Sequence, residues 1–104
     1  MDWNIQENME LIEAILALKN PKEAKSFLRD LMTEGEIEEF SKRLLTAKML
    51  TDKISYIEIE KKTGLSSTTI ARVSKWLSGK GGGYKTILNK IHHHNSIQTG
   101  RGLS

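Results

Sequence analysis

The chain contains no cysteine and no long apolar run, and each absence removes a class of function. Without a thiol among its 104 residues, it can form no disulfide framework, thiolate nucleophile or zinc–thiolate site. No apolar stretch approaches the roughly 20 residues of a membrane-spanning helix. The opening MDWNIQENMEL places acids early and no basic segment before an apolar run, unlike a signal peptide. We therefore expect a small cytoplasmic protein without a membrane segment.

The residue groupings that support catalysis or cofactor binding are also missing. No base–nucleophile pairing is suggested, because the histidines fall together at His92, His93 and His94. Consecutive residues point in different directions and no cysteine could complete a tetrahedral metal site, so we interpret them as a polar tail or an expression remnant. The SGKGGGY segment at 78–84 lacks the length and the final Lys-Ser/Thr of a phosphate-binding loop. We expect no enzyme activity, metal or cofactor.

The charge is unevenly distributed along the chain. Residues 1–39 hold ten acidic and four basic side chains, a net of −6, whereas residues 40–104 hold three acidic and twelve basic ones, a net of +9; together these give the overall +3. Such segregation is typical of a polyanion-facing surface, although a solvated surface with chance segregation would look the same.

Apolar spacing predicts a first helix from about Trp3 to Leu18. Its apolar side is broader than the edge helix of a small monomer needs, so it offers surface that a second copy could bury. The apolar residues of this predicted helix are Ile5, Met9, Leu11, Ile12, Ile15, Leu16 and Leu18.

Capping signals place the next two helices. Asn20 can cap a helix that has Pro21 at its first position, where the missing N–H is harmless. Thr33 and Glu36 form a capping box, which predicts the start of a long third helix over about 34–51.

Residues 54–77, ISYIEIEKKTGLSSTTIARVSKWL, predict two short helices around a tight turn. Ser55 with Glu58 fits a capping box, and Gly64 can adopt the positive φ that ends the first helix. Ser66 or Ser67 can cap the second. The pattern is that of a helix–turn–helix over about 55–77, whose second helix could enter a DNA major groove.

The second of these helices separates apolar from polar side chains. Ile70, Val73 and Leu77 share one face, and short hydroxyl-bearing residues followed by cations occupy the other. The residues predicted to face base edges are Ser67, Thr68, Thr69 and Ala71. Those predicted near phosphates are Tyr56, Lys61, Lys62, Arg72, Lys75 and Lys80.

A last helix is expected from Tyr84 to about His92. We expect residues 1–94 to form one all-α, six-helix domain for DNA binding and dimerisation, followed by a flexible tail over 95–104.

The order of elements resembles the Trp repressor superfamily, and most closely its YerC/YecD-type branch. The resemblance rests on LMTEGEIEEFSKRLLTAKMLT at 31–51, followed directly by the predicted helix–turn–helix, with TTIARVS at 68–74. Glu60 also fits, since it stands four residues before the turn glycine, where Trp repressors carry a long polar residue and most helix–turn–helix proteins a small one. The resemblance implies an intertwined homodimer with two DNA-reading heads.

The same resemblance suggests a ligand pocket with three matching residues and two departures. Arg43 and Arg72 match the two arginines that flank the bound tryptophan in Trp repressors, and Thr33 matches a residue whose backbone carbonyl lies at that site. Val73, however, replaces a glycine and Trp76 a serine, and both changes add bulk. We therefore do not expect tryptophan to act as corepressor.

The leading interpretation is a homodimeric, sequence-specific regulator of transcription, expected to be a repressor, that binds double-stranded DNA without tryptophan as corepressor; whether another small molecule controls it is left open by the sequence. Two alternatives remain: a helical module that binds protein, and a metabolite-responsive repressor with a pocket near Arg43 and Arg72. Salt-sensitive retention on duplex DNA separates the first alternative from DNA binding.

Overall fold

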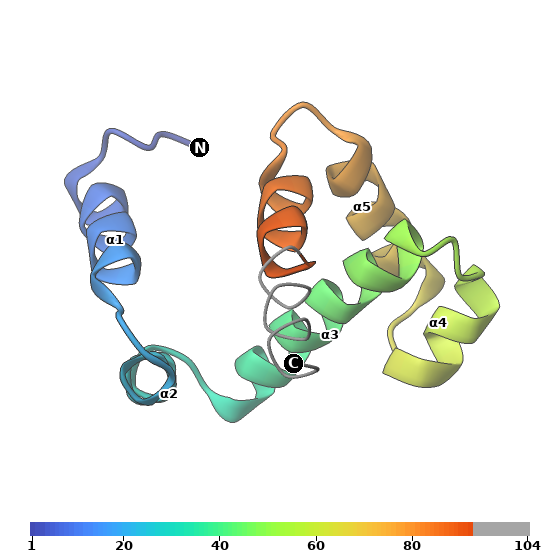
Figure 1. Ribbon diagram of the computed structural model, residues 1–104, viewed down its shortest axis with the longest axis horizontal. Helices are drawn as coiled ribbons and strands as arrows, with labels where there is room; N and C mark the ends of the chain where they lie inside the picture. Colours follow the sequence, from blue (N-terminus) through green and yellow to red (C-terminus); the bar gives the residue numbers. More distant parts are fainter. Residues whose placement is uncertain (93–104) are drawn as a thin grey trace, which may run out of the picture. The chain divides into compact units, whose positions relative to one another are not determined.

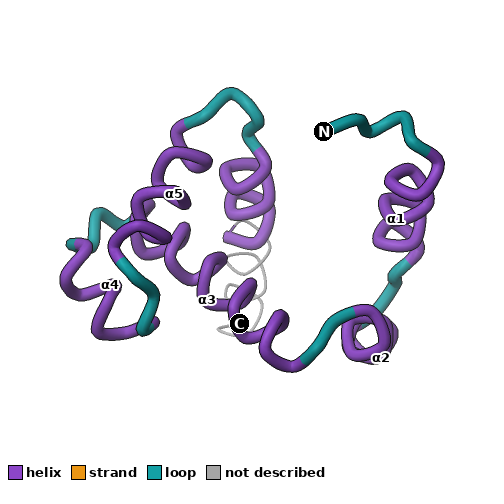
Figure 2. The backbone as a smooth tube through the Cα atoms, turned by 180° about the vertical axis from the view of Figure 1, so that it is seen from behind, coloured by secondary structure: helices purple, strands orange, loops and turns teal. Residues whose placement is uncertain are grey.

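The computed structural model describes residues 1–92, and every regular element in that range is helical. The chain divides into two compact units, Met1–Ile37 and a second that begins at Glu38. Figures 1 and 2 trace the helices of both. The expected tail over 95–104, together with His93 and His94, lies outside the described residues, and the prediction of a single domain over 1–94 stays a prediction.

The first unit contains α1 (Gln6–Ala17) and α2 (Pro21–Leu31). Helix α1 begins three residues later than predicted, because the Asp2 carboxylate accepts the Asn4 N–H at 2.8 Å and holds the preceding residues in a turn. Helix α2 begins as predicted: the Asn20 side chain accepts the Glu23 N–H at 2.9 Å.

No residue of this first unit is buried. The α1 side chains that the sequence assigned to a broad apolar face lie at the surface, with Leu16 78% exposed and Met9 48% exposed. Neither α1 nor α2 contains a buried side chain. A helix pair that buries so little apolar surface lacks the main source of stability of a folded unit.

The predicted capping box opens α3 (Glu34–Thr51). The Thr33 hydroxyl accepts the Glu36 N–H at 3.1 Å, and the Glu36 carboxylate accepts the Thr33 N–H at 2.9 Å. This reciprocal pair satisfies two donors that a helix start leaves free. The backbone hydrogen bond from Thr33, followed by its side-chain bond, lowers the pKa of the Glu36 carboxyl.

Helices α4 (Tyr56–Thr63) and α5 (Ser67–Ser78) follow the predicted pattern closely. The side chains of Ser55 and Ser66 each accept the N–H of the residue three positions on, at 3.3 and 3.2 Å. Gly64 ends α4 with φ 75°, a left-handed conformation that favours glycine. Residues 83–92 are also helical and run beside α3 in both ribbon views.

A small core fixes α4 and α5 against each other. Ile59 of α4, Leu65 of the turn and Ile70 of α5 are buried together, and Ile59 and Ile70 have no exposed surface. Partly buried apolar side chains of α3 and the segment after it pack against this cluster; they are Met49, Leu50 and Ile54. These contacts set the angle at which α5 leaves the turn.

Thr63 supplies the polar counterpart of this core. Its hydroxyl donates to the Ile59 carbonyl at 2.8 Å and accepts the Leu65 N–H at 3.1 Å. Thr63 is only 4% exposed, so water cannot readily replace either bond. The hydroxyl therefore ties the end of α4 to the first residue of the turn that enters the core.

Thr63→Val should lower the free energy of unfolding by about 1–3 kcal/mol, because the isosteric side chain leaves the buried Leu65 N–H without an acceptor. Thr51→Val is the matched control, since the Thr51 hydroxyl makes a similar bond to the Ala47 carbonyl at 2.9 Å from an exposed residue. Urea denaturation of both variants measures the difference. Equal losses in the two would contradict this role for Thr63.

Candidate nucleic-acid interface

Helix α5 presents two chemically distinct sides. Ile70 and Val73 are buried and Leu77 is half-buried, as the sequence predicted for the inner face. The solvent side carries Ser67, Thr68, Ala71, Arg72 and Lys75, all of them exposed. A row of short side chains beside two cations leaves this side able to approach a polyanion closely.

Thr69 differs from the other predicted base-facing residues. It is half-buried, and its hydroxyl lies 3.1 Å from the Ser66 hydroxyl while its N–H is capped by the same atom. Thr69 therefore belongs to the start of the helix as much as to its outer face. Ser67, Thr68 and Ala71 are the more accessible of the four.

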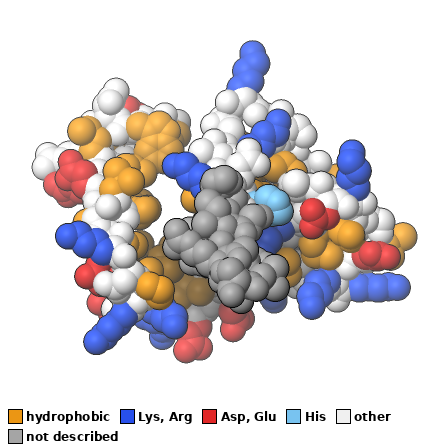
Figure 3. Space-filling view, viewed as in Figure 1, with side chains coloured by type: hydrophobic (Ala, Val, Ile, Leu, Met, Phe, Trp, Pro, Cys, Tyr) orange, Lys and Arg blue, Asp and Glu red, His pale blue; other side chains and the backbone are white. Residues whose placement is uncertain are grey.

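The residues predicted near phosphates are all exposed at the surface. Tyr56 begins α4 and is 40% exposed, Lys61 and Lys62 end the same helix, and Lys80 follows α5. The two ion pairs found within residues 1–92, Arg29–Glu34 and Arg43–Glu39, use none of these side chains. Figure 3 shows basic side chains standing out from the surface that carries α4 and α5, so this surface is free to attract anions.

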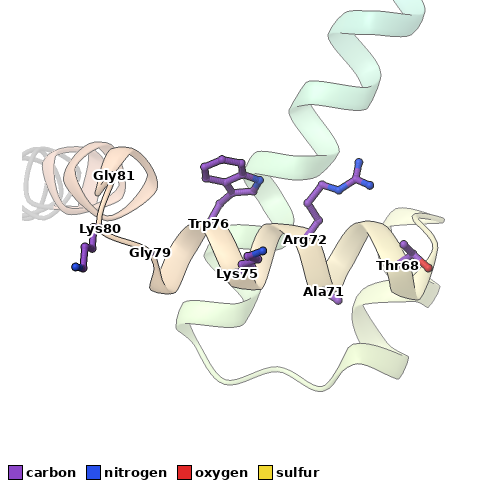
Figure 4. A pocket seen from close by; sticks show the side chains of 8 residues that line it. All are labelled: Thr68, Ala71, Arg72, Lys75, Trp76, Gly79, Lys80 and Gly81. Atoms are coloured by element: carbon purple, nitrogen blue, oxygen red, sulfur yellow. The ribbon is translucent and has the colours of Figure 1, made fainter. Parts of the chain in front are cut away.

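A hollow of about 550 Å³ opens beside the last turns of α5. Arg72 and Trp76 rise from the same side of the helix, one turn apart, and the glycine-containing loop after α5 closes the far end (Figure 4). Every charged side chain that lines it is a cation. The lining residues are Thr68, Ala71, Arg72, Lys75, Trp76, Gly79, Lys80 and Gly81.

Only two of the five residues that the resemblance suggested for a ligand pocket, Arg72 and Trp76, line this hollow. Val73 is 3% exposed and belongs to the buried side of α5. The Thr33 backbone carbonyl, which the resemblance placed at the site, accepts the Ile37 N–H at 3.1 Å, and the Thr33 hydroxyl accepts the Glu36 N–H in the cap of α3.

Arg43 is occupied by its own helix. Its Nη2 lies 3.3 Å from a Glu39 carboxylate oxygen, and its guanidinium carbon lies 5.4 Å from the centre of the Phe40 ring. Both contacts hold the guanidinium against α3. The Arg43 Nε is shielded from solvent and has no hydrogen-bond partner among the described residues.

The exposure of Trp76 is the feature that the sequence did not indicate. The resemblance suggested that the Trp76 indole adds bulk to a ligand pocket, yet Trp76 is 64% exposed and forms a wall of the hollow. Its position could have been found from spacing, because Trp76 follows Arg72 by four residues and so shares the outer side of α5. No role was predicted for the SGKGGGY segment beyond the exclusion of a phosphate-binding loop, although Gly79 and Gly81 line the hollow.

Among residues 1–92 no group of three or more His, Asp or Glu side chains is arranged to hold a metal ion. None of the helices in this range combines the length and apolar character needed to cross a membrane.

Comparison with known proteins agrees with this arrangement of helices. The chain is 37% identical over 82 residues to the uncharacterized protein YerC of Bacillus subtilis (strain 168), which covers 79% of each chain. The crystal structure of a TrpR-like protein from Eubacterium eligens superimposes with a TM-score of 0.82 at 37% identity, over 86% of this chain and 93% of that one.

A candidate Trp repressor from Staphylococcus aureus superimposes equally well, with a TM-score of 0.81 at 36% identity over 88% of this chain and 95% of that one. The family model described as Trp repressor protein matches residues 6–92, which include all five labelled helices and the segment that follows them. These similarities, together with the helix order and the caps of α3 to α5, show that the chain is a member of the Trp repressor family.

Proposed function

We propose that this protein is a sequence-specific DNA-binding regulator of transcription that works as a homodimer, with α4 and α5 as its helix–turn–helix. The observation that carries the proposal is the solvent side of α5, where Thr68, Ala71, Arg72 and Lys75 are exposed. Neither Arg72 nor Lys75 forms an ion pair with an acidic side chain within residues 1–92. Membership of the Trp repressor family supports the same function.

The geometry of α5 suits a major groove. The Ile59–Leu65–Ile70 core holds the buried side of α5 and leaves its opposite side free. Short side chains such as Thr68 and Ala71 can approach base edges, where a threonine or alanine methyl group can contact a thymine methyl. Lys61 and Lys62 at the end of α4 are placed to neutralise phosphates, as the first helix of such a motif crosses the backbone.

The first unit supports a homodimer. Residues 1–37 bury no side chain, and an exposed apolar surface of this kind indicates an interaction site. A hollow of about 370 Å³ lies on α1 and the residues before it, and its surface is mostly apolar. Its lining residues are Trp3, Met9, Ile12 and Glu13. A second copy of the same unit could bury these side chains and supply the core that each chain lacks.

The same residues argue against tryptophan as corepressor. Val73 fills the buried side of α5 at the position where the resemblance to Trp repressors implies a glycine, and Glu39 already pairs with Arg43. The hollow beside Arg72 keeps a metabolite-responsive repressor as a second candidate, but neither Arg43 nor Thr33 lines it. We therefore propose DNA binding without a tryptophan switch.

Purified protein should select duplex DNA from a genomic pool, with an affinity that falls as salt rises. Thr68→Ala should relax the preference at one base pair, at a cost of about 1–3 kcal/mol.

Lys61→Ala should weaken binding to every sequence and reduce the salt slope by about 1. Lys25→Ala, in α2, is the matched control and should leave the slope unchanged; absence of salt-sensitive binding to any duplex would identify a protein-binding module instead.

Met9→Glu should convert the dimer to a less folded monomer, because it places a charge on the apolar side of α1. In a monomer the same change, at a side chain 48% exposed, would alter stability by only about 0.5 kcal/mol. Gln6→Glu, which adds the same charge at the start of α1, is the control. Light scattering and circular dichroism measure both properties, and a folded wild-type monomer at micromolar concentration would contradict the proposal.

L-tryptophan should neither bind with micromolar affinity nor raise operator affinity. Overfilling a packed site typically costs about 1–3 kcal/mol, which corresponds to roughly a ten- to hundredfold loss of affinity. Calorimetry and DNA-binding measurements with and without tryptophan test this. A tenfold gain in operator affinity would show that Val73 and Trp76 still leave room for the ligand.

A further inference from the structure

The exposed indole of Trp76 needs an explanation that the proposed contacts of α5 do not supply. It is one of the larger exposed apolar side chains among the described residues, at 64% exposure, and every charged side chain that lines the same hollow is a cation. Tryptophan at such a position is characteristic of binding surfaces, where one broad side chain contributes much of the affinity.

The charged side chains around Trp76 favour a polyanion as its binding partner. Arg72, Lys75 and Lys80 line the same hollow, and no carboxylate does. The indole N–H is a donor without acceptor capacity, so it too favours an acceptor-rich partner. A hollow lined by one indole and three cations suits a strand of nucleic acid, which offers an apolar sugar next to each phosphate.

The position of Trp76 along α5 indicates which part of the DNA it would contact. Thr68, predicted to face base edges, precedes Trp76 by eight residues, or about 12 Å along a helix that rises 1.5 Å per residue. The major groove is itself about 12 Å wide. An α5 whose Thr68 end contacts bases would therefore bring its Trp76 end to a wall of the groove, where the sugar–phosphate backbone lies.

We infer that Trp76 is a DNA-contact residue: its indole packs against a deoxyribose at the groove wall while Arg72, Lys75 and Lys80 engage the neighbouring phosphates. The inference rests on the proposed DNA-binding function and adds to it a contact that carries no net charge. The continuity of the hollow with Thr68 and Ala71 favours DNA over a second copy of the chain, since a surface covered by a partner could not also enter a groove.

Trp76→Leu should lower affinity about tenfold for every duplex, within the range typical of a lost aromatic contact to nucleic acid. It should leave the salt slope unchanged, because no charge is removed, whereas Lys75→Ala and Lys80→Ala should each reduce the slope. Trp76→Phe should restore part of the affinity. Ile87→Ala, at another exposed apolar side chain outside the hollow, should bind like the wild type.

Fluorescence gives a direct readout of the contact. Trp3→Phe, used once light scattering has shown that it keeps the oligomeric state of the wild type, leaves Trp76 as the single tryptophan. Acrylamide should quench it readily in the free protein but poorly once duplex DNA is bound. Shielding already present without DNA, and lost on dilution, would assign the indole to an interface between copies and overturn the inference. Unchanged quenching on DNA, or wild-type affinity of Trp76→Leu, would also overturn it while leaving DNA binding itself established.

Discussion

The joint between α4 and α5 depends on the buried Thr63 hydroxyl, which bonds to the Ile59 carbonyl of α4 and to the Leu65 N–H of the turn. That core contains few side chains, with Ile59, Leu65 and Ile70 at its centre. Gly64 allows the chain to reverse and the Ser66 cap starts α5 immediately afterwards. Because the turn is short and Met49, Leu50 and Ile54 pack against the same core, the direction of α5 is set by contacts between neighbouring segments of the chain, from the end of α3 to the start of α5.

This local construction explains why much of the fold could be predicted from the sequence. The capping box of Thr33 and Glu36, the Asn20 cap and the left-handed Gly64 are each signals within four residues, and the structure contains all of them. The start of α1 was misplaced because Asp2 competes for a backbone N–H, a contact that apolar spacing does not register. Helix periodicity also predicted which side of α5 is buried.

The site was less predictable, because periodicity gives the direction of a side chain and not what covers it. Val73 and Trp76 both follow Arg72 closely and both looked like bulk added to a pocket, yet one is 3% and the other 64% exposed. Thr69 was predicted on the same basis as Thr68, but its hydroxyl is held by Ser66. The hollow depends on a loop that folds back beside α5, and no local pattern specifies that course.

The absence of a core in the first unit has a consequence for protein abundance in the cell. In the proposed homodimer, a helix pair that buries no side chain of its own would gain its stability on association, so the folded fraction would rise with concentration. Newly made chains at low concentration would expose α1 and α2 to proteases. Degradation of unpaired chains would make the amount of folded protein depend still more steeply on the rate of synthesis. Occupancy of a DNA site would then increase more than proportionally with synthesis, so that modest changes in expression produce a threshold in regulation.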